Sequence, residues 1–371
     1  MSVPSEAFAA SLAGFDAMTV HRLGALLRNR SPEEAFAVAC GEVPVGGLVG
    51  RVLADPAVRR AWRASAVARH PERIWDQLGD LGVRVLVHGT PEYPHLLVGD
   101  PLPPPVLFVR GDLDALAGRR VAIVGTRNAT AAGRAAARAF AGGLVSAGVH
   151  VVSGLARGVD GVAHREALAV GGPGRPIAVV ASGHDVVYPT EHAGLWREVG
   201  ERGVLLSEAP PGAPPLAHRF PLRNRIIAAL SEVVVVVESR ERGGSLITAT
   251  EALDRGVPVM AVPGPAVNRA AAGTNGLLRD GAAPAVDVDD ILLALSIEHR
   301  RAAPAEVRPP VRPSDRPVYG ALGCQSLTVD GLVEACGLSL VEVAMSVARL
   351  EQAGWIAGAD GWFEQVGAPW R

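Results

Sequence analysis

Short apolar runs rich in β-branched residues alternate with helical segments between Val121 and Gly264. Strands that are apolar on both faces and separated by helices are typical of a parallel sheet covered on both sides. We therefore expect a doubly wound, mostly parallel α/β sheet. Its strands are predicted at VAIVG (121–125), HVVSG (150–154), IAVVA (177–181), VLLSE (204–208), VVVVVE (233–238) and VPVMAVPG (257–264).

The pattern on the N-terminal side of this block is different. Residues 1–80 show apolar residues at helical spacing and a capping pattern, SPEE, at 31–34, which predicts a small helical domain. Two short strands, VRVLV (83–87) and VLFV (106–109), then follow on either side of a Pro-rich segment. We place the α/β domain at residues 81–298.

Beyond this domain the composition changes again. Residues 299–317 are rich in Pro, Arg and Ala without apolar periodicity, which is typical of a linker. Residues 318–371 have the pattern of helix, turn, helix and β-hairpin. This order predicts a C-terminal winged-helix domain.

The turns after the predicted strands contain glycine and arginine. Each is expected where a strand leads into a helix N-terminus, so that backbone N–H groups and guanidinium groups face the same place. Ligands of open α/β sheets bind at the carboxyl ends of the strands, so the turns together predict a phosphate-bearing ligand. They read GTRNAT (125–130), SGLARGVDGVAH (153–164), ASGHDVVYP (181–189), FPLRNRI (220–226), ESRERGGSLIT (238–248) and VPGP (262–265).

The first turn offers three candidate residues. Gly125 permits close backbone approach, Thr126 can cap the following helix, and Arg127 can meet a phosphate. The alternative for this turn alone is an ordinary strand-to-helix connection with a surface arginine.

The second turn is more specific. Ser153, Gly154 and Gly158 build a compact turn that carries Arg157. Asp160 is expected to cap the next helix, with a structural rather than a binding role.

Four residues of FPLRNR are candidates as well. Phe220, Arg223, Asn224 and Arg225 are expected just before an apolar helix, where guanidinium and amide groups suit phosphates and sugars. A solvated helix start is the alternative.

The remaining candidates are a glycine-serine pair and an aromatic residue. Gly244 and Ser245 begin a predicted helix and could cradle a phosphate. Tyr188, like Phe220, could stack on a base, although packing is the alternative for both aromatic rings.

Charge gives no sign of a protein covered in positive groups. The net charge is −2 and the pI about 6.6, so any nucleic-acid contact must come from a local patch. The chain contains no lysine, and all 36 basic residues are arginine. This excludes P-loop and Schiff-base lysines, and codon bias is the simplest cause of the absence.

Composition also bears on compartment and cofactors. The chain has no long apolar run and no basic leader before an apolar stretch, so we expect a cytoplasmic protein without membrane contact. Cys40, Cys324 and Cys336 lack the spacing of a zinc site or a disulfide framework. No nucleophile pairs with His184 and Asp185, so neither catalytic residues, metal nor cofactor are expected.

The motifs, taken in order, resemble the DNA-processing protein A family (DprA, also called Smf). They are VAIVGTR, SGLARGVDGVAHREAL, YP at 188–189, LLSEAPPG, FPLRNRIIAALS, GGSLITATEAL and VPVMAVPG. The resemblance covers about residues 82–295 and implies an extended Rossmann-like fold. It further implies a non-catalytic binder of single-stranded DNA that forms a homodimer and helps to load the RecA recombinase during natural transformation.

The resemblance also implies particular DNA contacts. Where many relatives have a basic residue after the YP pair, this chain has Thr190, and Gly243-Gly244-Ser245 replaces the usual SGS. The implied contacts are Gly125, Thr126, Arg127, Ser153, Gly154, Arg157, Gly158, Phe220, Arg223, Asn224 and Arg225.

Two other functions stay open at this point. Rossmann-like nucleotide hydrolases carry PGGxGT followed by a glutamate, which Gly243, Gly244, Thr248 and Glu251 match only in part. Alternatively, a nucleotide sensor could bind a free ligand in the same pocket and signal to the winged helix.

Overall fold

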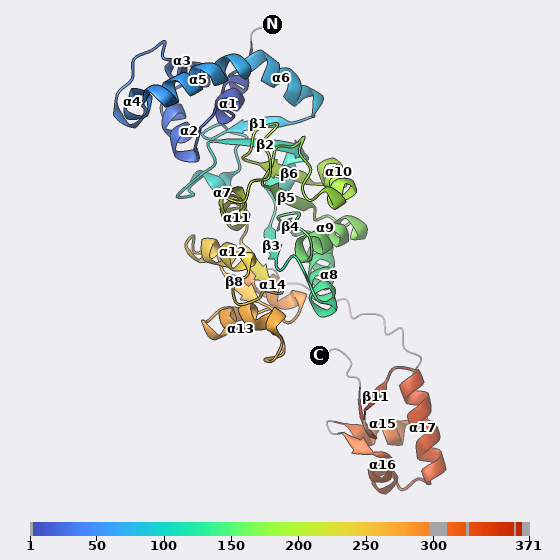
Figure 1. The fold of residues 1–371 in the computed structure, drawn as a ribbon. Helices are drawn as coiled ribbons and strands as arrows, with labels where there is room; N and C mark the ends of the chain where they lie inside the picture. The colour runs from blue at the N-terminus through green and yellow to red at the C-terminus, as the bar shows by residue number, and fades with distance from the viewer. Residues whose placement is uncertain (1–2, 297–309, 324–325, 360, 366–371) are drawn as a thin grey trace. The chain divides into compact units, whose positions relative to one another are not determined.

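The computed structural model describes residues 3–296, 310–323, 326–359 and 361–365. The chain divides into two compact units, Met1–His299 and Arg300–Arg371. The first contains a large sheet with helices on both faces, and the second is a small helical domain with a short sheet (Figure 1).

Nine strands form the sheet of the first unit within the described residues, in the spatial order β1-β2-β6-β5-β4-β3-β7-β8-β9. The strands from β3 to β9 pair in parallel, whereas β1 and β2 add an antiparallel edge. All the predicted parallel strands are present, so the doubly wound sheet is confirmed. The strands are β1 (Arg84–Val87), β2 (Val106–Gly111), β3 (Arg120–Val124), β4 (His150–Ser153), β5 (Pro176–Val180), β6 (Val204–Ser207), β7 (Val233–Val236), β8 (Val259–Ala261) and β9 (Ala283–Pro284).

Alternate residues of each strand pack against opposite helical layers. Ala122 and Val124 of β3 belong to the core beneath one layer, and Val121 and Ile123 to the core beneath the other. The first layer contains α7 (His95–Val98), α11 (Arg219–Ala229) and α12 (Gly244–Leu253), and the second contains α8 (Ala131–Ser146), α9 (Val159–Val170), α10 (Ala193–Arg202) and α14 (Val288–Ala294).

The direction of winding reverses between β3 and β7. From β3 the chain proceeds through β4, β5 and β6 on one side, and it then returns to β7 on the other side, where Val121 pairs with Val233. The carboxyl ends of β3 and β7 therefore flank a topological switch point, which is where open α/β sheets bind ligands.

The N-terminal helices share a core with the sheet edge. Trp62 and Leu26 pack in one cluster with Val85 of β1 and Phe108 of β2. The expected boundary near residue 80 therefore does not separate two compact units, because β1 and β2 bury apolar residues on both faces. These helices are α1 (Ser5–Ala13), α2 (Val20–Leu27), α3 (Pro32–Cys40), α4 (Gly47–Ala54), α5 (Pro56–Ala68) and α6 (Pro71–Asp80).

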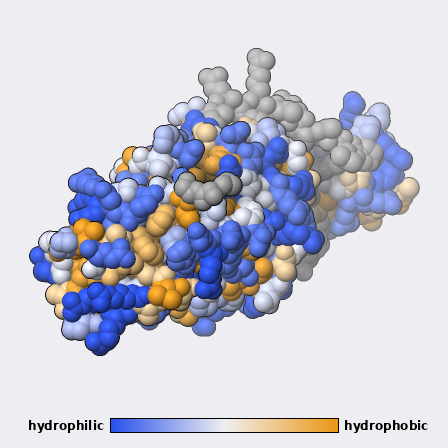
Figure 2. Space-filling model, turned by 90° about the horizontal axis from the view of Figure 1, so that it is seen from above, coloured by the Kyte–Doolittle hydropathy of each residue, from blue (hydrophilic) through white to orange (hydrophobic). Residues whose placement is uncertain are grey.

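Figure 2 shows the molecule from above the view of Figure 1, with hydrophilic residues across much of the visible face and smaller hydrophobic patches between them. Within the described ranges, no single helix is long and apolar enough to cross a membrane. Two helices of the second unit, α16 (Val329–Cys336) and α17 (Leu340–Gln352), reach that length and apolarity only when taken together, and they are bent by 113° relative to one another. The remaining elements of the first unit are the short helices η1 (Leu113–Leu116), η2 (Thr190–His192) and η3 (Arg269–Ala271), together with α13 (Ala272–Arg279).

The second unit has the element order of a winged helix. Its elements are α15 (Arg316–Leu322), β10 (Leu327–Thr328), α16 (Val329–Cys336), α17 (Leu340–Gln352), β11 (Ile356–Ala359) and β12 (Trp362–Gln365), with the sheet order β10-β12-β11. The expected linker ends too late, because Asp315 is buried in an ion pair with Arg349 and α15 already begins at Arg316. Residues 299–309 of that linker, and Cys324, lie outside the described part of the chain.

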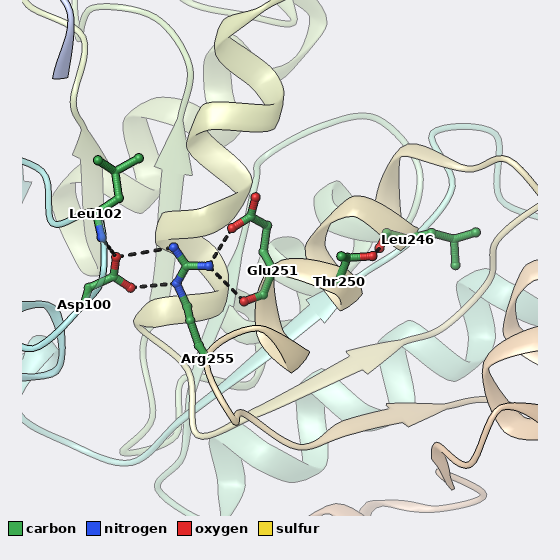
Figure 3. Close-up of polar contacts among 6 residues, drawn as sticks. All are labelled: Asp100, Leu102, Leu246, Thr250, Glu251 and Arg255. Carbon is green, nitrogen blue, oxygen red and sulfur yellow. Dashed lines mark hydrogen bonds and ion pairs between the residues drawn. The ribbon is translucent and has the colours of Figure 1, made fainter. Parts of the chain in front are cut away.

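A buried ion pair fixes the end of α12 to the segment before β2 (Figure 3). Nε of Arg255 lies 2.6 Å from an oxygen of Asp100, and Nη1 lies 2.5 Å from a carboxylate oxygen of Glu251. The Asp100 carboxylate also accepts the N–H of Leu102 at 2.8 Å. Both members of the Arg255–Asp100 pair are nearly inaccessible to solvent.

Asp100→Ala should lower the free energy of unfolding by about 3 kcal/mol, because it removes the buried partner of a buried guanidinium and leaves it only the more exposed Glu251. Urea unfolding followed by tryptophan fluorescence measures the loss. Asp280→Ala is the matched control, since its pair with Arg279 is exposed and should contribute less than about 1 kcal/mol. Equal effects of the two variants would show that the buried pair does not stabilise this region.

Candidate nucleic-acid interface

A cavity of about 740 Å³ lies at the switch point, against the carboxyl ends of β3 and β7. The chain segments that line it are far apart in sequence and come from the ends of β3 and β7 and from helices α9, α11 and α12. Of the predicted site residues, those that line the cavity are Gly125, Thr126, Arg127, Tyr188, Phe220, Arg223, Asn224, Gly244 and Ser245. The others, Ser153, Gly154, Arg157, Gly158 and Arg225, are not part of its lining.

The turn after β3 is held by the end of β7. The N–H of Thr126 donates to the carbonyl of Glu238 at 2.7 Å, and the Glu238 carboxylate accepts from the N–H and hydroxyl of Thr130. The expectation that Thr126 caps the next helix is wrong. Thr130 caps α8 by accepting from Gly133, whereas the hydroxyl of Thr126 accepts the N–H of Asn128.

Arg127 lies on an aromatic pair. Its guanidinium is 5.1 Å from the ring centre of Phe220, which lies 5.6 Å from the ring of Tyr188. A cation over an aromatic face is oriented by the ring quadrupole. Within the described residues no carboxylate pairs with Arg127, which is exposed at the cavity. Its positive charge therefore remains available to a ligand.

The turn after β4 is fixed at Gly154 from two sides. The Asp160 carboxylate accepts the N–H of Gly154 at 3.0 Å, and Nη1 of Arg223 donates to the Gly154 carbonyl at 2.6 Å. The same guanidinium donates to the carbonyl of Val179 at the end of β5. A Cβ on residue 154 would lie 2.6 Å from the Arg223 guanidinium, so any larger residue would push that guanidinium away from the Gly154 carbonyl.

Burial shifts the pKa values of both charged groups in this arrangement. The pKa of Arg223 is lowered to about 10. Burial is the main cause and repulsion from Arg127 adds to it, while attraction to Asp160 acts in the opposite direction. Burial raises the pKa of Asp160, while Arg223 and the N–H groups of Ala156 and Gly154 oppose that rise. Asp160 is thus a buried partner of the turn and not the helix cap that the sequence suggested.

The residues of the FPLRNR motif (220–225) lie on different faces of helix α11. The motif lies inside α11 and not before it, so residues at i, i+3, i+4 and i+7 share one face. Phe220, Arg223, Asn224 and Ile227 consequently face the cavity. Arg225 falls on another face, where Nη2 contacts both oxygens of Glu208 at 2.7 and 2.8 Å. Arg225 is therefore engaged in a buried ion pair outside the cavity.

Two further predicted residues, the last residue of β4 and a glycine before α9, shape the turn between them. The hydroxyl of Ser153 donates to the carbonyl of Ile123 at 2.6 Å and is fully buried. Gly158 has φ +72° and ψ −126°, and a Cβ there would lie 2.2 Å from the carbonyl oxygen of Thr126. Both residues therefore hold the turns after β3 and β4 together.

Arg157 lies in a smaller neighbouring cavity of about 270 Å³ that it shares with Arg127 and Tyr188. Its Nη2 donates to the carboxylate of Glu191 at 2.8 Å. Because both side chains are exposed, the pair contributes little and a phosphate could displace it.

Two arginines that were not among the sequence candidates also line the main cavity, Arg240 and Arg242. Their position directly before the glycine pair, in ESRERGG, was the available signal. The charged groups of the lining are thus Arg127, Arg223, Arg240, Arg242 and the buried Asp160. The cavity is therefore strongly positive in a protein whose net charge is −2.

The start of α12 completes the lining. No side chain caps this helix, whose first residues, Gly244 and Ser245, border the cavity. The hydroxyl of Ser245 donates to that of Ser239 at 3.0 Å. An uncapped helix N-terminus beside several arginines is an arrangement that binds anions. Fold and cavity together define a Rossmann-like protein with a positively charged cavity at its switch point.

Comparison with known proteins identifies the family. The family model described as DNA recombination-mediator protein A matches residues 84–296, and the chain belongs to this family. Protein Smf of Escherichia coli is 38% identical over 282 residues, which are 74% of this chain and 75% of that protein. A putative DNA processing protein DprA of Mycobacterium tuberculosis is 41% identical over 268 residues, covering 70% of this chain and 68% of that protein.

Two solved structures agree with this assignment. DNA processing protein A from Streptococcus pneumoniae superposes with a TM-score of 0.66 at 29% identity, covering 81% of this chain and all of that one. DNA processing protein A from Helicobacter pylori, described for its single-stranded DNA binding mode, gives a TM-score of 0.51 at 30% identity, covering 58% of this chain and 95% of that one. The Rossmann-like fold expected from the sequence is thus confirmed.

Gly158→Ala should destabilise the protein by at least about 3 kcal/mol, because it combines a backbone conformation reserved for glycine with a clash against the Thr126 carbonyl. Gly171→Ala is the control, since Gly171 also has positive φ but open space around it, and it should cost only about 1–2 kcal/mol. Urea unfolding of both variants gives the comparison. If the two losses were the same, the contact with Thr126 would not constrain the turn.

Proposed function

We propose that this protein binds single-stranded DNA in the switch-point cavity as a non-catalytic recombination mediator. The observation that carries the proposal is the unpaired guanidinium of Arg127, held over Phe220 beside the buried Arg223. Two like charges that repel one another across a cavity gain from an anion placed between them. A DNA phosphate supplies that anion, and the aromatic pair supplies a surface for a base.

The proposed roles divide the predicted residues into two groups. Residues of the lining contact the strand: Gly125, Thr126, Arg127, Tyr188, Phe220, Asn224, Gly244 and Ser245, with Arg240 and Arg242 added. Ser153, Gly154, Gly158 and Arg223 shape the turns that present them. Arg157 contacts DNA only after it leaves Glu191, and Arg225 supports α11 through Glu208.

The wider role follows from family membership. We propose that the chain acts as a homodimer in the cytoplasm and helps to load the RecA recombinase onto incoming single strands during natural transformation. The match to the family model covers residues 84–296, so these functions are assigned to the first unit.

The hydrolase alternative is disfavoured by the position of Glu251. That interpretation needs the Glu251 carboxylate beside the glycine pair, but the carboxylate lies at the other end of α12 and pairs with Arg255 (Figure 3). It is not part of the cavity lining. A binding role fits this geometry better than hydrolysis.

Fluorescence anisotropy should show strong preference for a single-stranded oligonucleotide over a duplex of the same length and over a mononucleotide. The turns can clasp a flexible backbone but present no element shaped for a major groove. A nucleotide sensor would instead prefer the mononucleotide, and a hydrolase would release product in a parallel assay. Equal affinity for single strand and duplex would contradict the proposal.

Arg127→Ala should weaken single-strand binding by about 1.5–3 kcal/mol, because it removes charge-assisted hydrogen bonds to a phosphate. One lost phosphate contact should also reduce the slope of log affinity against log salt by about 0.7. Anisotropy across a salt series measures both quantities. Arg127→Lys should recover the charge but not the two-pronged contact.

Arg138→Ala is the matched control, because Arg138 is an exposed arginine of α8 paired with Glu166 outside the cavity. It should leave affinity and salt slope unchanged. An unchanged slope for Arg127→Ala, in a protein with normal melting, would make Arg127 an ordinary surface arginine.

A further inference from the structure

A second cavity, of about 400 Å³, lies between α2 and α11. Its walls are mainly apolar and include Met18 from the segment before α2, Leu23 from α2, and Leu222 and Ile226 from α11. Its volume falls in the range of small-molecule sites, which are mostly apolar with a few polar groups. A ligand in the switch-point cavity would not occupy this second cavity, because the two linings share only Arg223.

Arg219 gives the second cavity a polar group without a protein partner. The Arg219 side chain lines the cavity, and its guanidinium forms no hydrogen bond or ion pair with the described residues, with Nη1 buried and the rest of the residue partly exposed. A guanidinium that no protein acceptor engages can take an acceptor from a ligand without breaking an existing hydrogen bond. An anionic group satisfies a guanidinium best.

The one carboxylate in the lining is already neutralised. Both oxygens of Glu208 accept from Nη2 of Arg225, which lies behind the cavity wall. The negative charge of Glu208 is balanced by Arg225. The positive charge of Arg219 is therefore left over, and the three residues together carry one net positive charge. The cavity thus combines an apolar interior with a net positive group.

Helix α11 places this cavity behind the proposed DNA site. Leu222 and Ile226 face the second cavity, while Phe220 and Asn224 face the first, and Arg223 borders both. The two faces follow from the helical repeat. Each cavity can therefore be altered through residues that the other does not use.

We propose that the second cavity is a binding site for a small amphiphilic anion, with its apolar body between α2 and α11 and its carboxylate, sulfonate or phosphate on Arg219. This inference goes beyond DNA binding and does not depend on it. The ligand class follows from the two properties of the lining: apolar walls and one unsatisfied guanidinium.

The probe for the test is 8-anilinonaphthalene-1-sulfonate, which joins an aromatic body to one sulfonate. The full chain should bind it at one saturable site, detected by fluorescence. Octanoate should displace it at least tenfold more effectively than 1-octanol, because only octanoate brings an anionic head. Arg219→Gln should weaken probe binding at least tenfold, and Arg219→Lys should recover part of the loss.

Leu222→Trp should block the cavity, because Leu222 is 41% exposed and lines it, so a larger ring can enter without disturbing the core. The control for Leu222→Trp is Leu253→Trp, at an exposed position of α12 outside both cavities. The control for Arg219→Gln is Arg138→Gln, at an exposed arginine that also lies outside both cavities. Both controls should bind the probe like the parent protein. Thermal melting verifies that each variant is folded, and Arg219→Gln decides the matter if Leu222→Trp does not fold.

Three outcomes would overturn the proposal. Binding that does not saturate would show only general surface affinity. Unchanged binding by both Leu222→Trp and Arg219→Gln would place the probe elsewhere. Binding lost in Arg127→Ala but kept in Arg219→Gln would place it in the switch-point cavity. DNA binding is measured separately, so failure here leaves the proposed function standing, and failure of DNA binding leaves this site standing.

Discussion

Both backbone polar groups of Gly154 are hydrogen-bonded to buried charged side chains, and the geometry of the switch-point cavity depends on this constraint. Asp160 binds its N–H and Arg223 binds its carbonyl, while Arg223 also reaches the end of β5. The turn after β4, with the start of α9 that follows it, is thereby joined to two elements distant in sequence, the middle of α11 and the end of β5. Removing one partner would leave the other charge buried, at a typical cost of about 3–5 kcal/mol.

The position of the other binding groups follows from that junction. Gly158, in the same turn, packs against the carbonyl of Thr126, so the turn after β3 is placed by the turn after β4. Arg127 then lies over Phe220 on the face of α11 that Arg223 fixes. The buried Arg223 therefore determines the position of Arg127, whose guanidinium is free to bind a ligand. One arginine of the family motif is structural, and another is available to a ligand.

The sequence alone was enough to predict the sheet, because apolar β-branched runs separated by helices permit few other arrangements. It also placed several candidate residues at the edge of the sheet where the cavity lies, since Gly125, Arg127 and Gly244 come directly after strands or begin a helix. It did not predict the face on which each α11 residue lies, because the start of that helix was placed too late. The roles of Arg225 and Asp160 were also wrong. Both side chains have buried partners that only the fold brings next to them, and the sequence does not show such partners.

Hydrogen exchange detected by mass spectrometry, with and without a single-stranded oligo-dT, tests the central claim most directly. If DNA occupies the switch-point cavity, slowed exchange should be concentrated in peptides covering 124–130, 154–160, 219–228 and 239–249. Peptides from α3 to α6 and from α15 to α17 should exchange as before. Protection confined to the N-terminal helices or to the second unit, with the four cavity segments unchanged, would contradict it.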